Sequence, residues 1–168
     1  MKYIISITLV LLLLLSACTT PNPTYEDPVS FYYIQNDVVF GSKSGVMKKT
    51  VREAGNNAGD YFELTKLYLN GPTTYDCVSP FPAGTTLEEL HWDQNRIQVL
   101  LSPQITTLSG SELTVACACL TRTLTEMTGI RTVQIRSTVG LLNGEKVLTM
   151  SADSIIYWDE ADPSDTFD

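Results

Sequence analysis

The chain has 168 residues, of which 43% are hydrophobic and 18% are charged. This length suits one domain, and the composition supplies a core and excludes a wholly disordered chain. The 19 acidic and 11 basic residues give a formal net charge of -8, which disfavours nucleic-acid binding because phosphate contacts require a basic face. His91 is the only histidine in the sequence, so multi-histidine metal sites are excluded.

The N-terminus resembles a bacterial lipoprotein signal. Lys2 precedes an apolar run over about residues 3–15, which is typical of a signal peptide and shorter than the roughly 20 residues of a membrane-spanning helix. The Leu-Ser-Ala-Cys segment at 15–18 resembles a lipobox, whose cysteine receives a diacylglyceryl group and becomes the mature N-terminus. We therefore expect residues 1–17 to be a lipoprotein signal peptide and Cys18 to carry the lipid. The alternative is a plain signal peptide with a chance cysteine.

A tether is predicted between this anchor and the folded domain. Residues 19–28 contain three prolines, which disfavour a helix and favour an extended chain. We expect residues 18–28, the lipidated cysteine and its tether, to lift a domain over 29–158 from the outer face of the cell membrane. The acidic tail over 159–168 is expected to fray.

The first part of the domain is predicted to contain three strands and a helix. Aromatic and β-branched residues favour a strand over 29–34, with a returning strand over 38–40 and a short strand near 49–52. Apolar spacing predicts a helix over 57–69 that ends at Gly71-Pro72. The side chains expected to share one face of this helix are Ala58, Phe62, Thr65 and Leu69.

A hairpin and a second helix are predicted next. Residues 86–92 and 96–101 pair as a hairpin whose second strand directs Ile97, Val99 and Leu101 to one side. Ser109 and Glu112 fit a capping box at the start of the helix. An apolar stripe at helical spacing follows, formed by Leu113, Cys117, Leu120 and Leu124.

The last part of the domain is predicted to return to strands. Gly129 fits a left-handed helix cap, and a strand is expected over 130–137. Asn143-Gly144 is a strong turn signal, with further strand over 147–150 and 155–158. This order of elements predicts an α+β fold with two helices packed on one face of a small mixed or antiparallel sheet.

Several of these segments resemble the GerM domain family, which is named for sporulation and spore-germination lipoproteins. The resemblance covers about residues 29–146, although 41–54 depart from the family pattern. The matching pieces are the helix end at 67–72 with its Gly-Pro stop, the Pro-x-Gly-Thr loop at 82–85, the strand ending in Leu-Ser at 99–102, the Thr-Leu-Thr-Glu segment at 123–126 and the Asn-Gly turn at 143–144.

The resemblance implies a non-catalytic domain outside the cytoplasmic membrane. Members of this family are associated with sporulation, germination or envelope signalling complexes, and their fold is similar to ring-building domains that pack against neighbours. The leading hypothesis is therefore a membrane-anchored lipoprotein that binds an envelope protein partner and that could form oligomers. It predicts membrane lipid as a partner through Cys18, no nucleic acid and no cofactor. The alternative is a peptidoglycan- or glycan-binding lipoprotein.

The cysteines suggest a metal or redox site only weakly. On a helix, Cys117 and Cys119 lie about 200° apart around the axis, so they cannot readily bond to each other or share a metal. We expect them to be small buried hydrophobic residues. Pairing of Cys77 with Cys117 or Cys119 in an oxidising envelope is the alternative.

A histidine and two pairs of adjacent acids could in principle support enzymatic chemistry. His91 could act as an acid or base, and the acid pairs Glu88-Glu89 and Asp159-Glu160 could serve glycoside hydrolysis. No marked nucleophile accompanies them, and adjacent acids on a strand face opposite ways. We therefore predict no catalytic, cofactor-binding or metal-binding residue.

The aromatic segment at the start of the domain suggests two further hypotheses about binding. Phe31, Tyr32 and Tyr33 could stack on a sugar, although a place partly in the core is expected. The strand over 29–34 could also form a sheet edge that recruits a partner strand.

Overall fold

The structure is a computed structural model that describes residues 25–36 and 45–155. Two α-helices occur within these residues, α2 (Tyr61–Leu69) and α3 (Gly110–Thr128), and no helix there is both long and apolar enough to cross a membrane. The strands are β1 (Pro28–Gln35), β2 (Met47–Glu53), β3 (Cys77–Val78), β4 (Leu87–Trp92), β5 (Ile97–Leu101), β6 (Thr132–Ser137) and β7 (Leu148–Ser151). Short 3-10 turns are η2 (Gly55–Asn57), η3 (Pro103–Thr107) and η4 (Ala152–Ser154).

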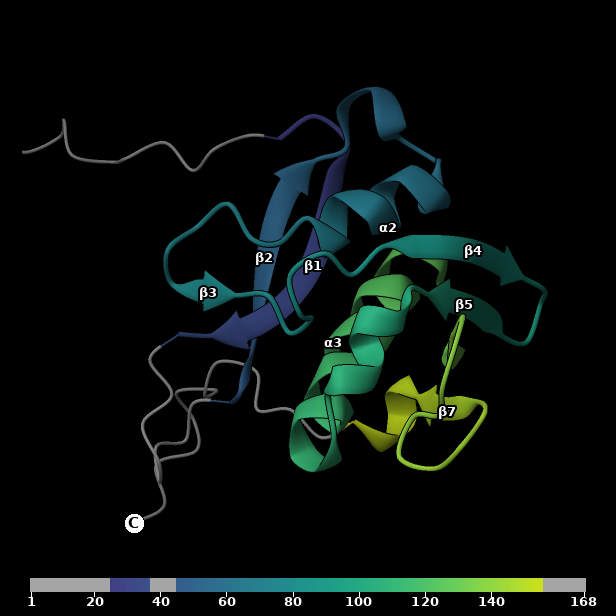
Figure 1. Ribbon diagram of the computed structural model, residues 1–168. Helices are drawn as coiled ribbons and strands as arrows, with labels where there is room; N and C mark the ends of the chain where they lie inside the picture. Colours follow the sequence, from purple (N-terminus) through teal and green to yellow (C-terminus); the bar gives the residue numbers. More distant parts are fainter. Residues whose placement is uncertain (1–24, 37–44, 156–168) are drawn as a thin grey trace, which may run out of the picture.

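The strands form two sheets around α3. One sheet is antiparallel in the order β2-β1-β3, and the other is mixed in the order β4-β5-β6-β7, with a parallel β5–β6 pair joined through α3. Figure 1 shows α3 running between the two sheets, where it contacts β1 on one side and β6 and β7 on the other. The predicted α+β class is confirmed, with two sheets in place of the single small sheet that we expected.

One continuous core joins these elements. All four residues of the predicted α3 stripe, from Leu113 to Leu124, are fully buried. The alternation predicted for β5 is also confirmed, because Ile97, Val99 and Leu101 are buried. Val133 and Ile135 of β6 face the same core. Local periodicity therefore identified the central helix and the strands that pack beside it.

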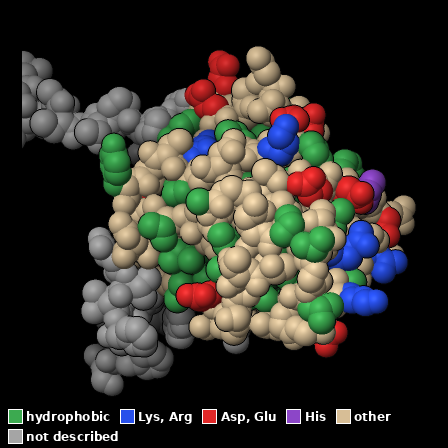
Figure 2. Space-filling view, in the orientation of Figure 1, with side chains coloured by type: hydrophobic (Ala, Val, Ile, Leu, Met, Phe, Trp, Pro, Cys, Tyr) green, Lys and Arg blue, Asp and Glu red, His purple; other side chains and the backbone are tan. Residues whose placement is uncertain are grey.

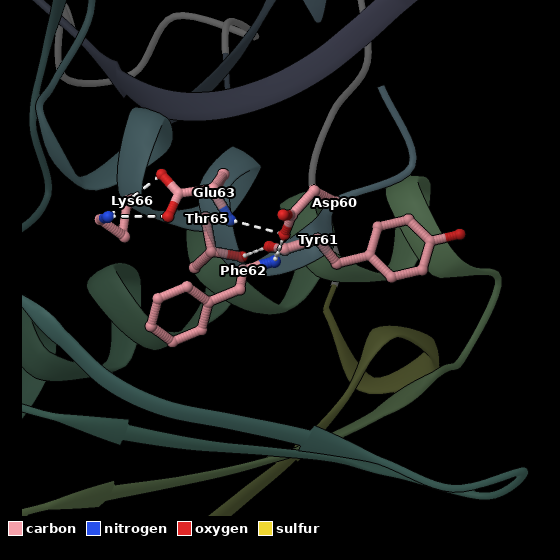
Figure 3. Close-up of polar contacts among 6 residues, drawn as sticks. All are labelled: Asp60, Tyr61, Phe62, Glu63, Thr65 and Lys66. Atoms are coloured by element: carbon pink, nitrogen blue, oxygen red, sulfur yellow. Dashed lines mark hydrogen bonds and ion pairs between the residues drawn. The ribbon is translucent and has the colours of Figure 1, made fainter. Parts of the chain in front are cut away.

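The first helix begins later than expected and buries a different face. The chain passes Gly59 with φ of 81°, and the Asp60 carboxylate then accepts hydrogen bonds from the N–H groups of Phe62 and Glu63, both at 3.1 Å (Figure 3). An N-cap at Asp60 starts the helix at Tyr61 and leaves Ala58 outside it. Leu64, Thr65 and Tyr68 are buried, while Phe62 and Leu69 are half-buried against the core. Of the predicted face, Thr65 is therefore buried, Phe62 and Leu69 lie at its margin, and Ala58 precedes the helix.

The capping box predicted for α3 is wrong. Ser109 occupies the N-cap position, but its side chain makes no capping hydrogen bond. Gly110 enters the helix with φ of 53°, outside the helical region, so the first turn lacks regular capping geometry. The Gly110 N–H instead donates to Asn143 Oδ1 at 3.2 Å. At the other end, the Gly129 cap is confirmed, with φ of 75° and a 2.8 Å bond from its N–H to the Thr125 carbonyl.

Most of the predicted strands are present. The strands expected over 29–34 and near 49–52 are β1 and β2, and the hairpin is β4–β5. Leu142 bridges Glu145 around Asn143 and Gly144, whose φ values of 48° and 84° fit the expected turn. The strand expected over 155–158 does not begin at Ile155, which follows η4. Four predicted segments lie outside the described residues: the N-terminal segment with Cys18, the strand over 38–40, the strand residues 156–158 and the tail over 159–168.

The central contact of the fold lies at Tyr32 in β1. Its N–H donates to Thr123 Oγ1 of α3 at 2.9 Å, and its carbonyl accepts from the Tyr68 hydroxyl of α2 at 2.9 Å. The Tyr33 hydroxyl donates to the Tyr68 carbonyl at 3.0 Å, and the two rings stack with centroids 5.0 Å apart. Burial raises the pKa of Tyr33 to about 12 and raises that of Tyr68 well above its ordinary value. Both helices are thus hydrogen-bonded to the main chain of one strand.

The three described cysteines belong to this core. Cys77, Cys117 and Cys119 are free thiols and all are buried. The disulfide alternative for Cys77 is therefore absent from the structure, and the expectation for Cys117 and Cys119 is met. Burial raises the pKa of both helix thiols to about 12, which keeps them protonated and weakly nucleophilic near neutral pH.

A matched pair of threonines tests the bond between α3 and β1. We expect Thr123→Val to lower the free energy of unfolding by about 1–3 kcal/mol, because a buried N–H loses its acceptor. Thr121 lies on the same helix, and its buried hydroxyl has no partner within the described residues. Thr121→Val is therefore expected to be neutral or stabilising. Urea unfolding of both variants measures the difference, and equal losses would contradict the role assigned to the Thr123 hydroxyl.

Thiol accessibility tests the placement of the cysteines. In a chain carrying Cys18→Ser, we expect Cys77, Cys117 and Cys119 to react slowly with a thiol-specific reagent at pH 8 in the native state. In denaturant all three should react at once, because burial is lost. A single reactive thiol per denatured chain, rising to three after reduction, would show a disulfide between two of them and overturn the assignment.

Candidate functional site

His91 lies at an exposed corner of the molecule. Its Nε2 is 3.6 Å from Glu89 Oε2, and the two side chains are 70% and 52% exposed. In Figure 2 the histidine lies at the periphery beside acidic side chains. A register shift between Leu87 and Glu89 leaves both Glu88 and Glu89 exposed, which differs from the expected opposite orientation. This arrangement is a solvated pair and provides no buried base.

The aromatic residues of β1 are unavailable for stacking on a sugar. Phe31, Tyr32 and Tyr33 have exposed fractions of 0%, 2% and 0%. The idea that they bind glycans is therefore wrong, because α2 and α3 cover them. A different aromatic pair is exposed: Trp92, 52% exposed, meets the half-buried Tyr61 edge-to-face with ring centroids 5.6 Å apart. Sequence reasoning missed this pair because α2 and β4 are distant in the chain.

The strand over 29–34 is not a free sheet edge. β2 pairs with β1 along one side, and β3 pairs with Ile34 and Gln35 on the other. The bonds from Thr123 and Tyr68 occupy the main chain of Tyr32 on that second side. The expected edge is therefore closed from Tyr32 onward, where helix side chains and β3 fill the position that a partner strand would need.

β2 is the outer strand of this sheet. Two main-chain hydrogen bonds show which residues of β2 face β1. The Gln35 N–H donates to the Val46 carbonyl, and the Ala54 N–H donates to the Asp27 carbonyl. Because the ladder alternates, the N–H and C=O groups of the intervening residues point outward. We call this row the β2 edge, which consists of Met47, Lys49, Val51 and Glu53. No other strand within the described ranges pairs with it.

The lysines of β2 are held against the body of the domain. Lys48 Nζ lies 2.7 Å from Asp76 Oδ2, and this hydrogen bond lowers the pKa of Asp76 to about 2. Lys49 Nζ lies 2.6 Å from Glu126 Oε1, and the pKa of Glu126 is lowered by that bond. Val51 is 38% exposed. Lysines whose side chains extend into solvent commonly protect an edge strand from pairing. Because Lys48 and Lys49 are held in ion pairs, the β2 edge is more accessible to a partner strand.

A cleft opens at the start of β1. It has a volume of about 480 Å³ and lies where β1, the first turns of α2 and the last turn of α3 meet. We call it the β1 cleft, and its lining includes Asp27, Ser30, Tyr61, Leu64, Glu126 and Met127. Three segments distant in the chain form it, so no sequence motif marks it. Within the described ranges, no three His, Cys, Asp or Glu residues are grouped to hold a metal.

Comparisons with known proteins agree with this fold. The tandem GerMN domains of the sporulation protein GerM from Bacillus subtilis superpose with a TM-score of 0.56 at 17% identity, covering 79% of this chain and 49% of that chain. The chain thus corresponds to about half of the tandem structure. The first GerMN domain of the same protein gives a TM-score of 0.53 at 17% identity, covering 66% and 82% of the two chains.

Sequence comparison identifies the family directly. The search of curated proteins gave no match. The sequence profile described as "Germane: Sporulation and spore germination" matches residues 30–138, which span β1 to just beyond β6. This match confirms the GerM-type resemblance of the sequence segments. The chain belongs to the Germane family of sporulation and spore germination.

Proposed function

We propose that this protein is a lipid-anchored envelope protein whose Germane domain binds other proteins and has no catalytic role. The observation that carries the proposal is the β2 edge, a strand of seven residues with one side unpaired within the described part of the chain. The family match to sporulation and spore germination gives the biological setting. Sporulation or germination complexes at the cell envelope are the expected context.

Strand addition is the binding mode that fits this edge. Four outward residues offer N–H and C=O groups at the spacing that an added strand requires. Main-chain hydrogen bonds would supply affinity, and the exposed Val51 side chain would contact alternate side chains of the partner. A second copy of the chain would be held in the same way, which gives a route to oligomers.

The anchor places the domain at its site of action. Cys18, with the tether over 18–28, would hold the domain at the extracytoplasmic face of the cell membrane. Each buried lipid CH₂ contributes ~0.8 kcal/mol, and stable anchoring requires more than one acyl chain. The diacylglyceryl group of a lipobox cysteine meets this requirement. Confinement to one surface also raises the effective concentration of the domain for partners on the same membrane.

A glycan-binding role is the second candidate. The exposed edge-to-face pair of Trp92 and Tyr61 supports it, because such amphipathic rings commonly contact the apolar face of sugars. This surface differs from the aromatic segment of β1, which is buried. Peptidoglycan is the glycan that an extracytoplasmic anchor would bring within reach.

Removing the lipid acceptor tests the anchor. We expect Cys18→Ser to lose incorporation of labelled palmitate and to move the protein from the membrane fraction to the soluble fraction of the envelope. Thr20→Ser is the matched control, since it leaves the lipobox intact and should keep both properties. Unchanged palmitate labelling of the Cys18→Ser protein would contradict the assignment of Cys18.

A proline on the β2 edge tests strand addition. The Val51 N–H points away from β1, so Val51→Pro removes an outward donor and spares the β1–β2 ladder. We expect this variant to keep its melting temperature within a few degrees and to lose crosslinks to its envelope partner in living cells. Val51→Thr keeps the N–H and a β-branched side chain and should retain the crosslinks.

The same experiment separates the candidate functions. Recovery of one defined protein with the native chain and Val51→Thr, but not with Val51→Pro, supports assembly through the β2 edge. Recovery of peptidoglycan fragments that disappears in Trp92→Ala supports the glycan-binding role. Equal protein recovery with Val51→Pro and Val51→Thr would contradict assembly through this edge.

A further inference from the structure

The β1 cleft contains an unused position of the β1 main chain. In β1 the odd-numbered residues bond to β2, so the N–H and C=O of Ser30 point to the opposite side, as those of Tyr32 do. Thr123 and Tyr68 satisfy Tyr32, but Ser30 has no main-chain hydrogen-bond partner within the described residues. Ser30 lines the cleft, so a donor and an acceptor are available there to an incoming chain.

Asp27 gives the cleft a second unusual feature. Its backbone φ is 47°, a left-handed conformation that is uncommon outside glycine. Among the described residues, Asn143 is the only other non-glycine residue with positive φ, and its turn requires that conformation. Strained backbone of this kind is concentrated at functional positions. Asp27 and Ser30 both line the cleft.

The charged residues that line the cleft are both acidic. Glu126 is the other acid on its wall, and its carboxylate is already engaged by Lys49 at 2.6 Å and by the Tyr32 hydroxyl at 3.3 Å. Asp27 takes part in none of the ion pairs formed within the described residues. No lysine or arginine lines the cleft. The Asp27 carboxylate, which forms no ion pair in the described part of the chain and lies on a wall without basic residues, favours a positively charged occupant.

The remaining wall of the cleft is apolar. Leu64 is buried, and Tyr61 and Met127 are half-buried beside it. A volume of about 480 Å³ lies within the range of small-ligand pockets. An occupant therefore meets a main-chain pairing position, a carboxylate and an apolar wall in one cleft. A peptide unit carries an acceptor and a donor at strand spacing and therefore matches the N–H and C=O of Ser30. The hydroxyl groups of a sugar match them less well.

We propose that the β1 cleft binds a short extended segment of another protein that carries a lysine or arginine. The main chain of the segment would pair with Ser30, its cationic side chain would lie beside Asp27, and a neighbouring apolar side chain would contact Leu64 and Met127. The pairing covers only about two or three residues of the segment, because successive residues of a strand alternate sides and Tyr32 is already occupied. This site is separate from the β2 edge.

Three peptides test the proposal by nuclear magnetic resonance on the isotopically labelled full chain in detergent micelles. The first is acetyl-Val-Lys-Val-amide, the second replaces its lysine with glutamate, and the third is the lysine peptide with N-methylated internal amides. We expect the first to bind saturably and to shift the amide resonances of Ser30, Gly59 and Met127. The other two should bind at least threefold more weakly, because each lacks one of the proposed interactions.

Protein variants separate the roles of charge and fold. Asp27→Asn keeps a residue that tolerates the left-handed conformation and removes the charge, so it should weaken binding of the lysine peptide about three- to fivefold. Glu112→Gln removes an exposed acid in the first turn of α3, whereas the cleft lies at the last turn, so binding should be unchanged. Val51→Pro should also bind the lysine peptide normally, which distinguishes this site from the proposed assembly edge.

Each other result would overturn the proposal. Equal binding of the glutamate peptide excludes recognition by Asp27, and equal binding of the N-methylated peptide excludes pairing with Ser30. Shifts confined to residues of β2 would place peptide binding at the β2 edge. Shifts of the cleft resonances by chitobiose, with none from the lysine peptide, would show that the cleft takes a sugar.

Discussion

The fold depends on how the main chain of Tyr32 is satisfied. This strand position is buried, and a buried N–H or C=O without a partner costs about 1–3 kcal/mol. Thr123 of α3 supplies the acceptor and Tyr68 of α2 supplies the donor. Two helices from different parts of the chain therefore satisfy one strand position, and the aromatic stack of Tyr33 on Tyr68 holds α2 against β1. The small antiparallel sheet is joined to the larger mixed sheet through these helices.

The features that the sequence predicted correctly are local ones. The buried stripe of α3, the β4–β5 hairpin and the Asn143-Gly144 turn each follow from residues close together in the chain. The errors arise where a distant segment decides the outcome. Ser109 makes no capping hydrogen bond, and the Gly110 N–H bonds to Asn143 instead. Most of the strand over 29–34 is closed on its second side, because α2 and α3 satisfy Tyr32 and β3 pairs with its last residues. The β1 cleft was not predictable for the same reason.

The two proposed binding surfaces use opposite sides of the same small sheet. Along β2, every second main-chain group faces outward over the length of the strand. Along β1, helix side chains leave one position unpaired at Ser30. The first surface suits a long extended partner and the second suits a short one. Glu126 lies between the two surfaces, because it holds Lys49 of β2 while lining the cleft.

The distance in sequence between Tyr32 and Thr123, 91 residues, has a consequence for how the chain matures. Folds dominated by such remote contacts form slowly, because a large loop must close before the contact contributes. In a chain that crosses a membrane N-terminus first, β1 emerges well before α3. Its aromatic side chains then remain exposed until most of the domain has followed, and unpaired apolar strands are prone to aggregate in this interval. The lipid attachment proposed for Cys18 would keep emerging chains dispersed over a surface during that delay.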